Sequence, residues 1–270
     1  MIRNDENVRC IAEGSQRHSS LVFVRGGIDT SLARALANPD RHYDLMLSLY
    51  QPAPEIPKLI DAGIGVYAGG WSKFHAALRI QQRFKSLDRY EQVLFLDADI
   101  GIDVDSVNRL FNAAKRAELA LCQPSLSVES STAWPFLRHD PRARGLRPTN
   151  FVEVMAPCFS RAALTRCLAS FDRSISTWGL DFLWPMMLRY RSIAVIDAVQ
   201  MRHLQPTDES NGAFYRYLNS IGIDQRAELA QLRASCPRWF RPGPMDPLLG
   251  WRGPFLLRKL NRFLARLRRA

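Results

Sequence analysis

The stretch YEQVLFLDADIGID, residues 90–103, decides the fold. Its apolar run at 93–96 predicts a buried strand, and the run leads into two carboxylates, Asp97 and Asp99. In open α/β sheets ligands bind beyond the carboxyl ends of strands, and residues two apart in an extended chain share a side. We therefore expect both carboxylates to face one site, where their hard oxygens suit Mg²⁺ or Mn²⁺.

Two other interpretations of this acidic pair remain open. It can cap the next helix, although Asp103 and Asp105 stand closer to that helix and suit the role better. Aspartate-nucleophile phosphatases also carry D-x-D after a strand, but they favour Thr or Val two residues beyond the second Asp. This chain has Gly101 there, and several predicted strands precede the motif, so the phosphatase reading is disfavoured.

Strand and helix patterns alternate on both sides of this stretch. Such alternation, with strands apolar on both faces, predicts an α/β fold with a mainly parallel sheet flanked by helices. Residues 127–150 interrupt the pattern and predict a long loop over a site, while the end of the chain is mostly helical. The predicted strands are 21–25, 44–50, 65–69, 92–96, 119–124, 151–157 and 193–196, and the predicted helices are 29–38, 72–87, 105–117, 160–171 and 178–188.

Composition is that of an ordinary globular protein. The 270 residues are 47% hydrophobic and 23% charged, enough for one large domain with a substantial core. We find no apolar run long enough for a membrane span and no apolar core of a signal peptide, and we expect a cytoplasmic protein. The five cysteines form no CxxC pair, so reduced thiols are expected rather than a disulfide framework or zinc site: Cys10, Cys122, Cys158, Cys167 and Cys236.

The positive charge is concentrated at the end of the chain. The formal net charge is +11, and residues 251–270 hold six arginines, one lysine and no acid. Residues 255–269 predict a basic amphipathic helix, which suits an anionic membrane surface. A terminal helix docked on the core, or a calmodulin-type partner segment, are the alternatives. No nucleic-acid-binding motif accompanies the charge, so we expect no nucleic-acid partner.

Three further stretches carry a family resemblance. They are FVEVMAPCFSR (151–161), WGLDF (178–182) and IAVIDAVQMRH (193–203), in order after the acidic motif and Gln123-Pro124. Together they resemble the family known as domain of unknown function 707, over about residues 20–208. Ala98 stands where plant members often have Glu. The resemblance covers an expected catalytic domain at 21–208. The polar residues 1–20 predict a loose N-terminus, and residues 209–270, which lie outside the resemblance, predict a helical C-terminal extension.

This family is similar to glycosyltransferases of the GT-A fold, a Rossmann-like α/β architecture whose enzymes use nucleotide-sugar donors. The resemblance implies a Mn²⁺ or Mg²⁺ ion on Asp97 and Asp99 that stabilises the leaving diphosphate. His203, after the last predicted strand, is the candidate third ligand; a surface or hydrogen-bonded histidine is the alternative. We interpret His18, His42, His75 and His139 as structural or surface residues.

Asp181 in WGLDF is the candidate catalytic base, because an acid on the first turn of a helix beside Trp178 would have a raised pKa. Trp-Gly followed by an acid resembles an acceptor-binding motif of some galactosyltransferases, so Trp178 and Gly179 are candidate acceptor-binding residues. A helix-capping Asp181 and a core Trp178 are the alternative. Glu153, expected within an apolar strand, is the second candidate catalytic carboxylate.

Donor binding is expected at the end of the first predicted strand. Arg25 and Gly26 are candidates there, since glycine admits a base or ribose close to the backbone. Lys73 opens a helix after two glycines and is a candidate for the diphosphate, with Asp97, Ala98 and Asp99 completing the donor set.

The sequence therefore favours a metal-dependent glycosyltransferase that moves a sugar to a glycan or lipid-linked glycan in surface polysaccharide assembly. We expect it at the inner face of the cytoplasmic membrane, anchored by residues 251–270. A direct base favours inversion at the anomeric carbon. The alternatives are a non-catalytic nucleotide-sugar or glycan-binding module, and a nucleotidyl- or phosphotransferase.

Overall fold

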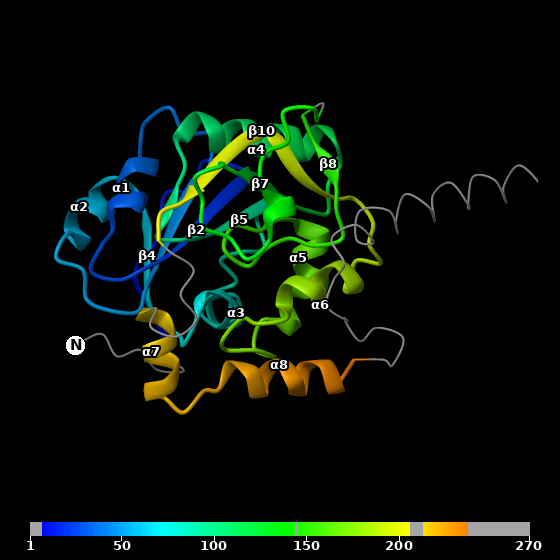
Figure 1. Cartoon of the computed structure of the whole chain (residues 1–270). Helices are drawn as coiled ribbons and strands as arrows, with labels where there is room; N and C mark the ends of the chain where they lie inside the picture. The colour runs from blue at the N-terminus through cyan, green and yellow to red at the C-terminus, as the bar shows by residue number, and fades with distance from the viewer. Residues whose placement is uncertain (1–6, 144, 206–212, 237–270) are drawn as a thin grey trace, which may run out of the picture.

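A computed structural model describes residues 7–143, 145–205 and 213–236. Its centre is a ten-stranded sheet in the order β1-β4-β3-β2-β5-β9-β7-β10-β6, with β8 also paired to β10. Figure 1 shows this sheet in the middle of the molecule with helices around it. The strands are β1 (Val8–Ala12), β2 (Ser20–Gly26), β3 (Asp44–Leu49), β4 (Gly65–Gly69), β5 (Gln92–Asp97), β6 (Ile100–Gly101), β7 (Leu121–Leu126), β8 (Arg147–Pro148), β9 (Cys158–Ser160) and β10 (Ile193–His203).

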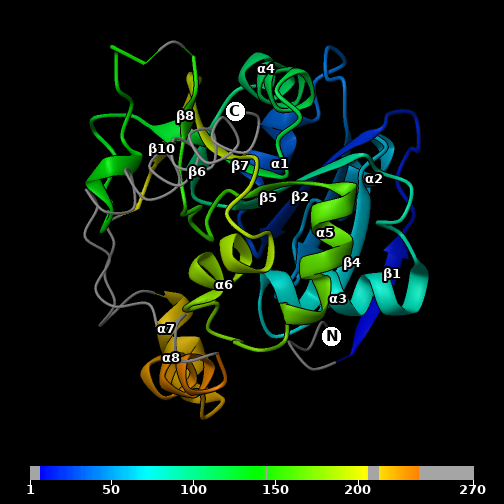
Figure 2. The ribbon, with the colours of Figure 1, turned by 90° about the vertical axis from the view of Figure 1, so that its right-hand side faces the viewer.

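Helices cover both faces of this sheet. They are α1 (Ser31–Leu36), α2 (Ile56–Asp61), α3 (Lys73–Phe84), α4 (Val104–Arg116), α5 (Arg161–Cys167), α6 (Leu180–Met187), α7 (Ala213–Ser220) and α8 (Gln225–Ala234). One core contains the buried residues of α1, α2 and α4, and the other contains those of α3, α5 and α6. Figure 2 shows the sheet between these two groups, with α7 and α8 beyond α6.

The central strands supply both cores because their side chains alternate. Val93 and Phe95 of β5 belong to the core under α3, while Leu94 and Leu96 belong to the core under α4. The same alternation continues to Asp97, which therefore faces α3. The apolar run at 93–96 is therefore confirmed as part of a buried strand, and helices cover the sheet on both sides of it.

The prediction of a mainly parallel sheet is confirmed. Strands β4, β3, β2 and β5 pair in parallel, as do β7 and β10, while β9 is antiparallel to both β5 and β7. Asp103 caps α4 by accepting a hydrogen bond from the backbone N–H of Ser106 at 2.6 Å. The next acid, Asp105, lies in the first turn. Helix capping therefore belongs to Asp103, as expected.

Two local predictions are wrong. The N-terminus is not loose throughout, because Val8–Ala12 forms the edge strand β1, antiparallel to β4. The predicted strand at 151–157 is irregular backbone, and only Cys158–Ser160 pairs as β9. The carbonyls of Met155 and Pro157 still accept hydrogen bonds from the backbone of β5. Side chains bind other backbone groups of this segment: Gln123 Oε1 accepts from the Glu153 N–H at 2.6 Å, and Lys73 Nζ donates to the Val154 carbonyl at 2.7 Å.

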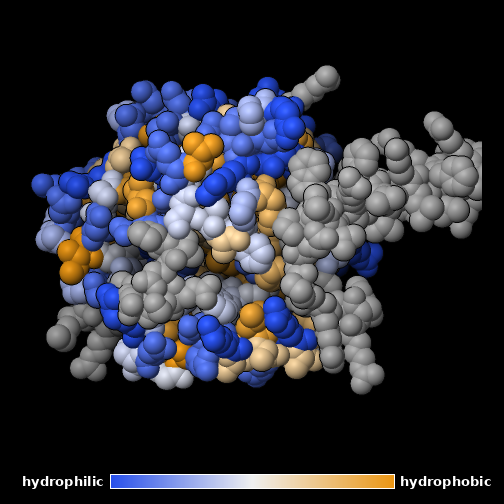
Figure 3. All heavy atoms as spheres, viewed as in Figure 1, coloured by the Kyte–Doolittle hydropathy of each residue, from blue (hydrophilic) through white to orange (hydrophobic). Residues whose placement is uncertain are grey.

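The C-terminal extension is described only through residue 236. The helical prediction holds for α7 and α8, whereas the predicted amphipathic helix at 255–269 lies outside the described residues. In the described ranges no helix is both long and apolar enough to cross a membrane. The face seen in Figure 3 is mainly hydrophilic, and its apolar patches are small and separate, an ordinary pattern for a globular protein.

Candidate active site

The two acids of the opening motif are held by different partners. The strand β5 ends at Asp97, and Ala98 and Asp99 form a turn before β6, so the expectation that both acids share a side of an extended strand is wrong. Asp97 Oδ1 lies 2.8 Å from Nζ of Lys73 on α3. Asp99 turns instead toward β10. The acids remain neighbours, and the charge of Asp99 acts to raise the pKa of Asp97.

Lys73 is a buried cation at the first position of α3. Its side chain is 4% exposed, whereas that of Asp97 is 42% exposed. Besides Asp97, its ammonium donates to the carbonyls of Val154 and Met155, at 2.7 and 3.1 Å. These three oxygens match the three N–H bonds of an ammonium group. Lys73 thus ties the 151–157 segment to the end of β5, and its proposed diphosphate contact stays a prediction.

The pairing of β10 with β6 places His203 beside Asp99. At the end of β10 it lies opposite Ile100 of β6, and its Nε2 is 3.4 Å from Asp99 Oδ2. The ring's Nδ1 lies 3.1 Å from the carbonyl of Ser131, so Nδ1 carries the proton and donates. The hydrogen bond to Asp99 raises the pKa of His203. The contact of Nδ1 with Ser131 fixes the ring so that Nε2 faces Asp99, and an imidazole that bound a metal through Nε2 would first release the proton of that nitrogen.

The loop at 127–150, expected over a site, supports His203. Ser130 Oγ accepts from the His203 backbone N–H at 3.1 Å. Farther along, Arg147 forms a buried ion pair with Asp197 at 2.6 Å and donates to carbonyls of the same loop. Asp197 is therefore a structural residue. The sequence reasoning missed Ser130 and Ser131, because no local pattern marks a loop that returns to a strand some seventy residues later.

Glu153 is a buried carboxyl without a hydrogen-bond partner for Oε2 among the described residues. It is 9% exposed. Burial raises the pKa of Glu153 to about 8, and the charge of Asp181 contributes to the same shift. The group is therefore mainly protonated at neutral pH and can donate a hydrogen bond. Such an unpartnered buried polar atom is rare and points to a ligand contact.

Asp181 lies in the first turn of α6 and is buried, as expected. Burial raises the pKa of Asp181 to about 7, while hydrogen bonds from backbone N–H groups, including that of Phe182, act in the opposite sense. The N-cap of α6 is Gly179, with φ of 86°, so Asp181 is not the cap. Half-buried Trp178 donates from Nε1 to the Tyr215 hydroxyl at 3.2 Å.

These side chains form one electrostatic unit, which we call the central cluster. The charges of Asp181, His203, Asp97 and Lys73 all influence the pKa of Glu153, and the charges of Asp99 and His203 influence that of Asp97. Within this set Lys73 contacts Asp97 and Asp99 contacts His203, and charge effects of this kind are strongest between neighbouring groups. The central cluster consists of Lys73, Asp97, Asp99, Glu153, Asp181 and His203.

Arg25 is placed differently from the central cluster. It is buried, and its guanidinium donates to Ser48 Oγ at 2.7 Å and to the carbonyls of Gly69 and Gly70. It also lies over the ring of Tyr50. Burial lowers the pKa of Arg25 to about 10. These contacts join the ends of β2, β3 and β4 at the edge where donor binding is expected.

Gly26 follows Arg25 at the end of β2. A Cβ at this glycine would lie 3.1 Å from Leu47 Cδ1, so packing alone already favours a small residue.

A divalent cation fits the donor set of the central cluster. Asp99 and His203 lie in contact, and the charges of both act on the pKa of Asp97. Carboxylate oxygens and an imidazole nitrogen are suitable ligands for Mn²⁺. The described side chains contain no ready-made group of three or more His, Cys, Asp or Glu ligands, since Asp97 Oδ1 faces Lys73. Water molecules or substrate oxygens would complete the coordination shell of the ion.

The comparisons with known proteins rest on structure. No family model and no curated protein matches this chain. The crystal structure of GalNAc-T7 with UDP, GalNAc and Mn²⁺ matches at a TM-score of 0.52 and 10% identity, covering 87% of this chain and 54% of that one. The chain has a GT-A fold. At this identity the likeness shows the fold alone.

TarS from S. aureus is a second match. Its residues 1–349 in complex with UDP-GlcNAc match at a TM-score of 0.48 and 13% identity, covering 79% of this chain and 71% of that one. A longer TarS chain matches at a TM-score of 0.46 and 12% identity, covering 82% of this chain and 44% of that one. The GT-A expectation is confirmed by the GalNAc-T7 match and the sheet topology, while membership of the domain of unknown function 707 family stays a prediction.

Proposed function

We propose that this protein is a metal-dependent glycosyltransferase that uses a nucleotide-sugar donor. The observation that carries the proposal is the central cluster: a paired acid and histidine adjoin two buried carboxyls with pKa values near neutrality at the end of a GT-A sheet. The GalNAc-T7 structure with UDP and Mn²⁺ supports a nucleotide-sugar donor and a divalent metal. Perturbed carboxyls gathered at one sheet end are typical of a catalytic centre.

Asp97, Asp99 and His203 would hold the metal. A bound Mn²⁺ or Mg²⁺ would supply positive charge for the diphosphate leaving group. Two contacts within the chain hold the candidate ligands in position: Ser131 fixes the His203 ring, and Lys73 fixes Asp97. Arg25, Gly26 and Ala98 lie along the neighbouring strand ends, and we assign the donor's nucleotide to that edge.

Asp181 would act as the base toward an acceptor hydroxyl. With a pKa of about 7, a large fraction of this carboxylate is ionised at neutral pH while its proton affinity remains high. Glu153, protonated at that pH, would donate a hydrogen bond from Oε2 to the sugar or acceptor. Trp178 and Gly179 would border the acceptor. Direct deprotonation of the acceptor favours inversion at the anomeric carbon.

The test is a thermal-shift series with nucleoside diphosphates and their sugars, with and without Mn²⁺. A selective, metal-dependent rise in Tm for the wild type that is lost in Asp99→Asn supports the proposal, because a ligand of the native state raises apparent stability. Product analysis then separates the alternatives. Release of a nucleoside diphosphate indicates sugar transfer, whereas pyrophosphate indicates a nucleotidyltransferase. Equal binding by Asp99→Asn, with no turnover by the wild type, would favour a non-catalytic module.

We further propose a glycan or lipid-linked glycan acceptor at the inner face of the cytoplasmic membrane. Residues 251–270 would provide the attachment through their basic charge. Deletion of these residues should release the protein from anionic liposomes without loss of nucleotide binding. Equal liposome binding by the truncated protein would refute the attachment.

A further inference from the structure

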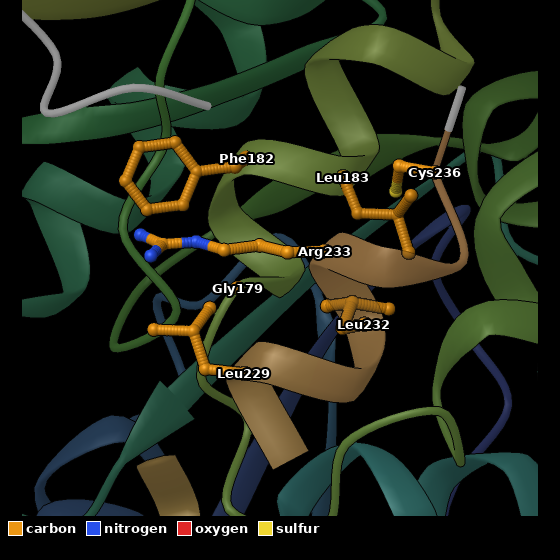
Figure 4. Close-up of a pocket in the computed structure, with 7 residues that line it drawn as sticks. All are labelled: Gly179, Phe182, Leu183, Leu229, Leu232, Arg233 and Cys236. Carbon is orange, nitrogen blue, oxygen red and sulfur yellow. The ribbon is translucent and has the colours of Figure 1, made fainter. Parts of the chain in front are cut away.

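The helix α8 packs directly against the start of α6, although it lies outside the stretch that carries the family resemblance. A Cβ at Gly179 would lie 2.8 Å from both Leu229 Cδ1 and Leu232 Cδ2. The crevice between these helices has a volume of only about 10 Å³ and is lined mainly by apolar side chains (Figure 4). It has room for no ligand larger than one water. The crevice is therefore a packed contact between α6 and α8.

The same face of α8 holds the loop that leads into α6. The Glu228 carboxylate accepts from the backbone N–H groups of Ile175 and Ser176, at 2.9 and 2.7 Å. It also accepts from the Ser174 hydroxyl at 3.4 Å. Hydrogen bonds to an ionised acceptor are stronger than neutral ones. One side chain from a distant helix thus satisfies two consecutive backbone donors of this loop.

This loop needs an external support. Thr177 has φ of 70° and Gly179 has φ of 86°. A threonine in the left-handed region is strained and persists only where neighbouring contacts hold it. The strained Thr177 directly precedes Trp178, and Asp181 follows within one helical turn. A small change in this loop would therefore rotate both side chains.

A second contact from the extension reaches the same loop. The hydroxyl of Tyr215, on α7, accepts the indole N–H of Trp178 at 3.2 Å. The rings of these two residues meet edge to face, with centroids 6.2 Å apart. The extension consequently contacts the candidate acceptor-binding residue directly and the loop before the candidate base through Glu228.

We infer that Glu228 is a positioning residue, which fixes the loop at 174–177 so that Trp178 and Asp181 face the acceptor. The chemical role rests on the proposed function, but the contact of Glu228 with the loop does not. Donor and metal binding involve other segments, at β2, β5 and β10. Loss of Glu228 therefore affects the acceptor half of the reaction and leaves nucleotide binding in place.

The experiment compares Glu228→Ala and Glu228→Gln with Gln231→Ala, an exposed control on the same helix. Hydrogen exchange should accelerate at the amides of 175 and 176 in Glu228→Ala, less in Glu228→Gln, which keeps one acceptor oxygen, and not in the control. In transfer assays kcat should fall by ~10- to 100-fold for Glu228→Ala, with unchanged metal-dependent nucleotide binding and unchanged kcat in Gln231→Ala.

Two results would overturn the inference. One is a hydrogen-exchange rate at the amides of residues 175 and 176 in Glu228→Ala that equals the wild-type rate. The other is faster exchange with a wild-type kcat, which would leave Glu228 as a purely structural residue. An inactive wild-type enzyme would instead refute the proposed function, and the exchange data would still decide whether Glu228 holds the loop.

Discussion

Nε2 of His203 lies 3.4 Å from Oδ2 of Asp99 where β10 meets β6, while Nδ1 donates to Ser131. This pair is the basis of the first prediction. The change His203→Ala removes one donor of the proposed metal site and should weaken Mn²⁺-dependent nucleotide binding by about tenfold or more. Calorimetric titration measures this effect. His42→Ala, an exposed histidine, is the control and should bind as the wild type does. Unchanged metal dependence in His203→Ala would remove this residue from the ligand set.

Lys73→Met should destabilise the protein. It leaves two carbonyl groups and Asp97 without their cation, and the expected loss in the free energy of unfolding is about 2–3 kcal/mol, reduced by the partial exposure of Asp97. Urea denaturation measures it. The matched control is Lys115→Met, which removes an exposed pair with Glu91 at 3.0 Å and should cost less than about 1 kcal/mol. Similar losses in both variants would contradict the structural role of Lys73.

Glu153→Gln should gain stability relative to the wild type as the pH rises. Since the pKa of Glu153 is raised from 4.5 to about 8, the native protein retains a proton there that the unfolded chain releases. Wild-type stability therefore declines from about pH 5 to pH 8, by at most ~1.4 kcal/mol per pH unit from this group. The glutamine variant lacks this decline. Denaturation curves at several pH values, with chelator present, test the prediction, and a pH-independent difference would contradict it.

Asp181→Asn should abolish the pH dependence that the proposed base introduces. In the proposed mechanism only the ionised form of Asp181 acts as the base, so the kcat of the wild type should rise with pH through an apparent pKa of about 7. The variant should lose ~10²- to 10⁴-fold in kcat. It should retain metal-dependent nucleotide binding. Steady-state rates over a range of pH values provide the measurement, and an active variant with the wild-type profile would assign the base elsewhere.

Gly179→Ala tests the contact between α6 and α8. The control is Gly222→Ala, because both glycines have positive φ, 86° and 76°, and a Cβ at Gly222 meets nothing within 4 Å. Each substitution carries a backbone cost of about 1–2 kcal/mol. Gly179→Ala should lower the free energy of unfolding by ~1–3 kcal/mol more than Gly222→Ala does, because the added methyl group collides with Leu229 and Leu232. Equal losses by thermal or urea denaturation would show that α8 moves aside without cost.

The sequence predicted best what depends on local periodicity. The strand at 92–97 and the helix after it follow from apolar spacing alone, and so does the edge of the sheet where Asp97 and Asp99 lie. It failed at 151–157, where Phe151 and Val152 enter opposite cores as they would in a strand. There the backbone is held partly by β5, through the N–H groups of Phe95 and Asp97, and partly by the side chains of Gln123 and Lys73. No spacing rule reveals a side chain that takes the place of a strand partner.

The remaining features depend on contacts between distant segments. The turn that separates Asp97 from Asp99 follows from the pairing of β6 with the end of β10, about one hundred residues later. Glu228 is likewise an ordinary helical acid in the sequence, and its importance appears only when α8 lies beside the loop at 174–177.

The pairing of β10 with β6 also sets an order of events during synthesis. About one hundred residues separate Asp99 from His203, and a ribosome adding ~5–20 residues per second needs roughly 5–20 s to make them. Through that interval the nascent chain carries the two acids without their histidine. The candidate site is therefore assembled late, once β10 has emerged, and a chain that stops before residue 203 can contain most of the sheet and still lack His203 beside Asp99.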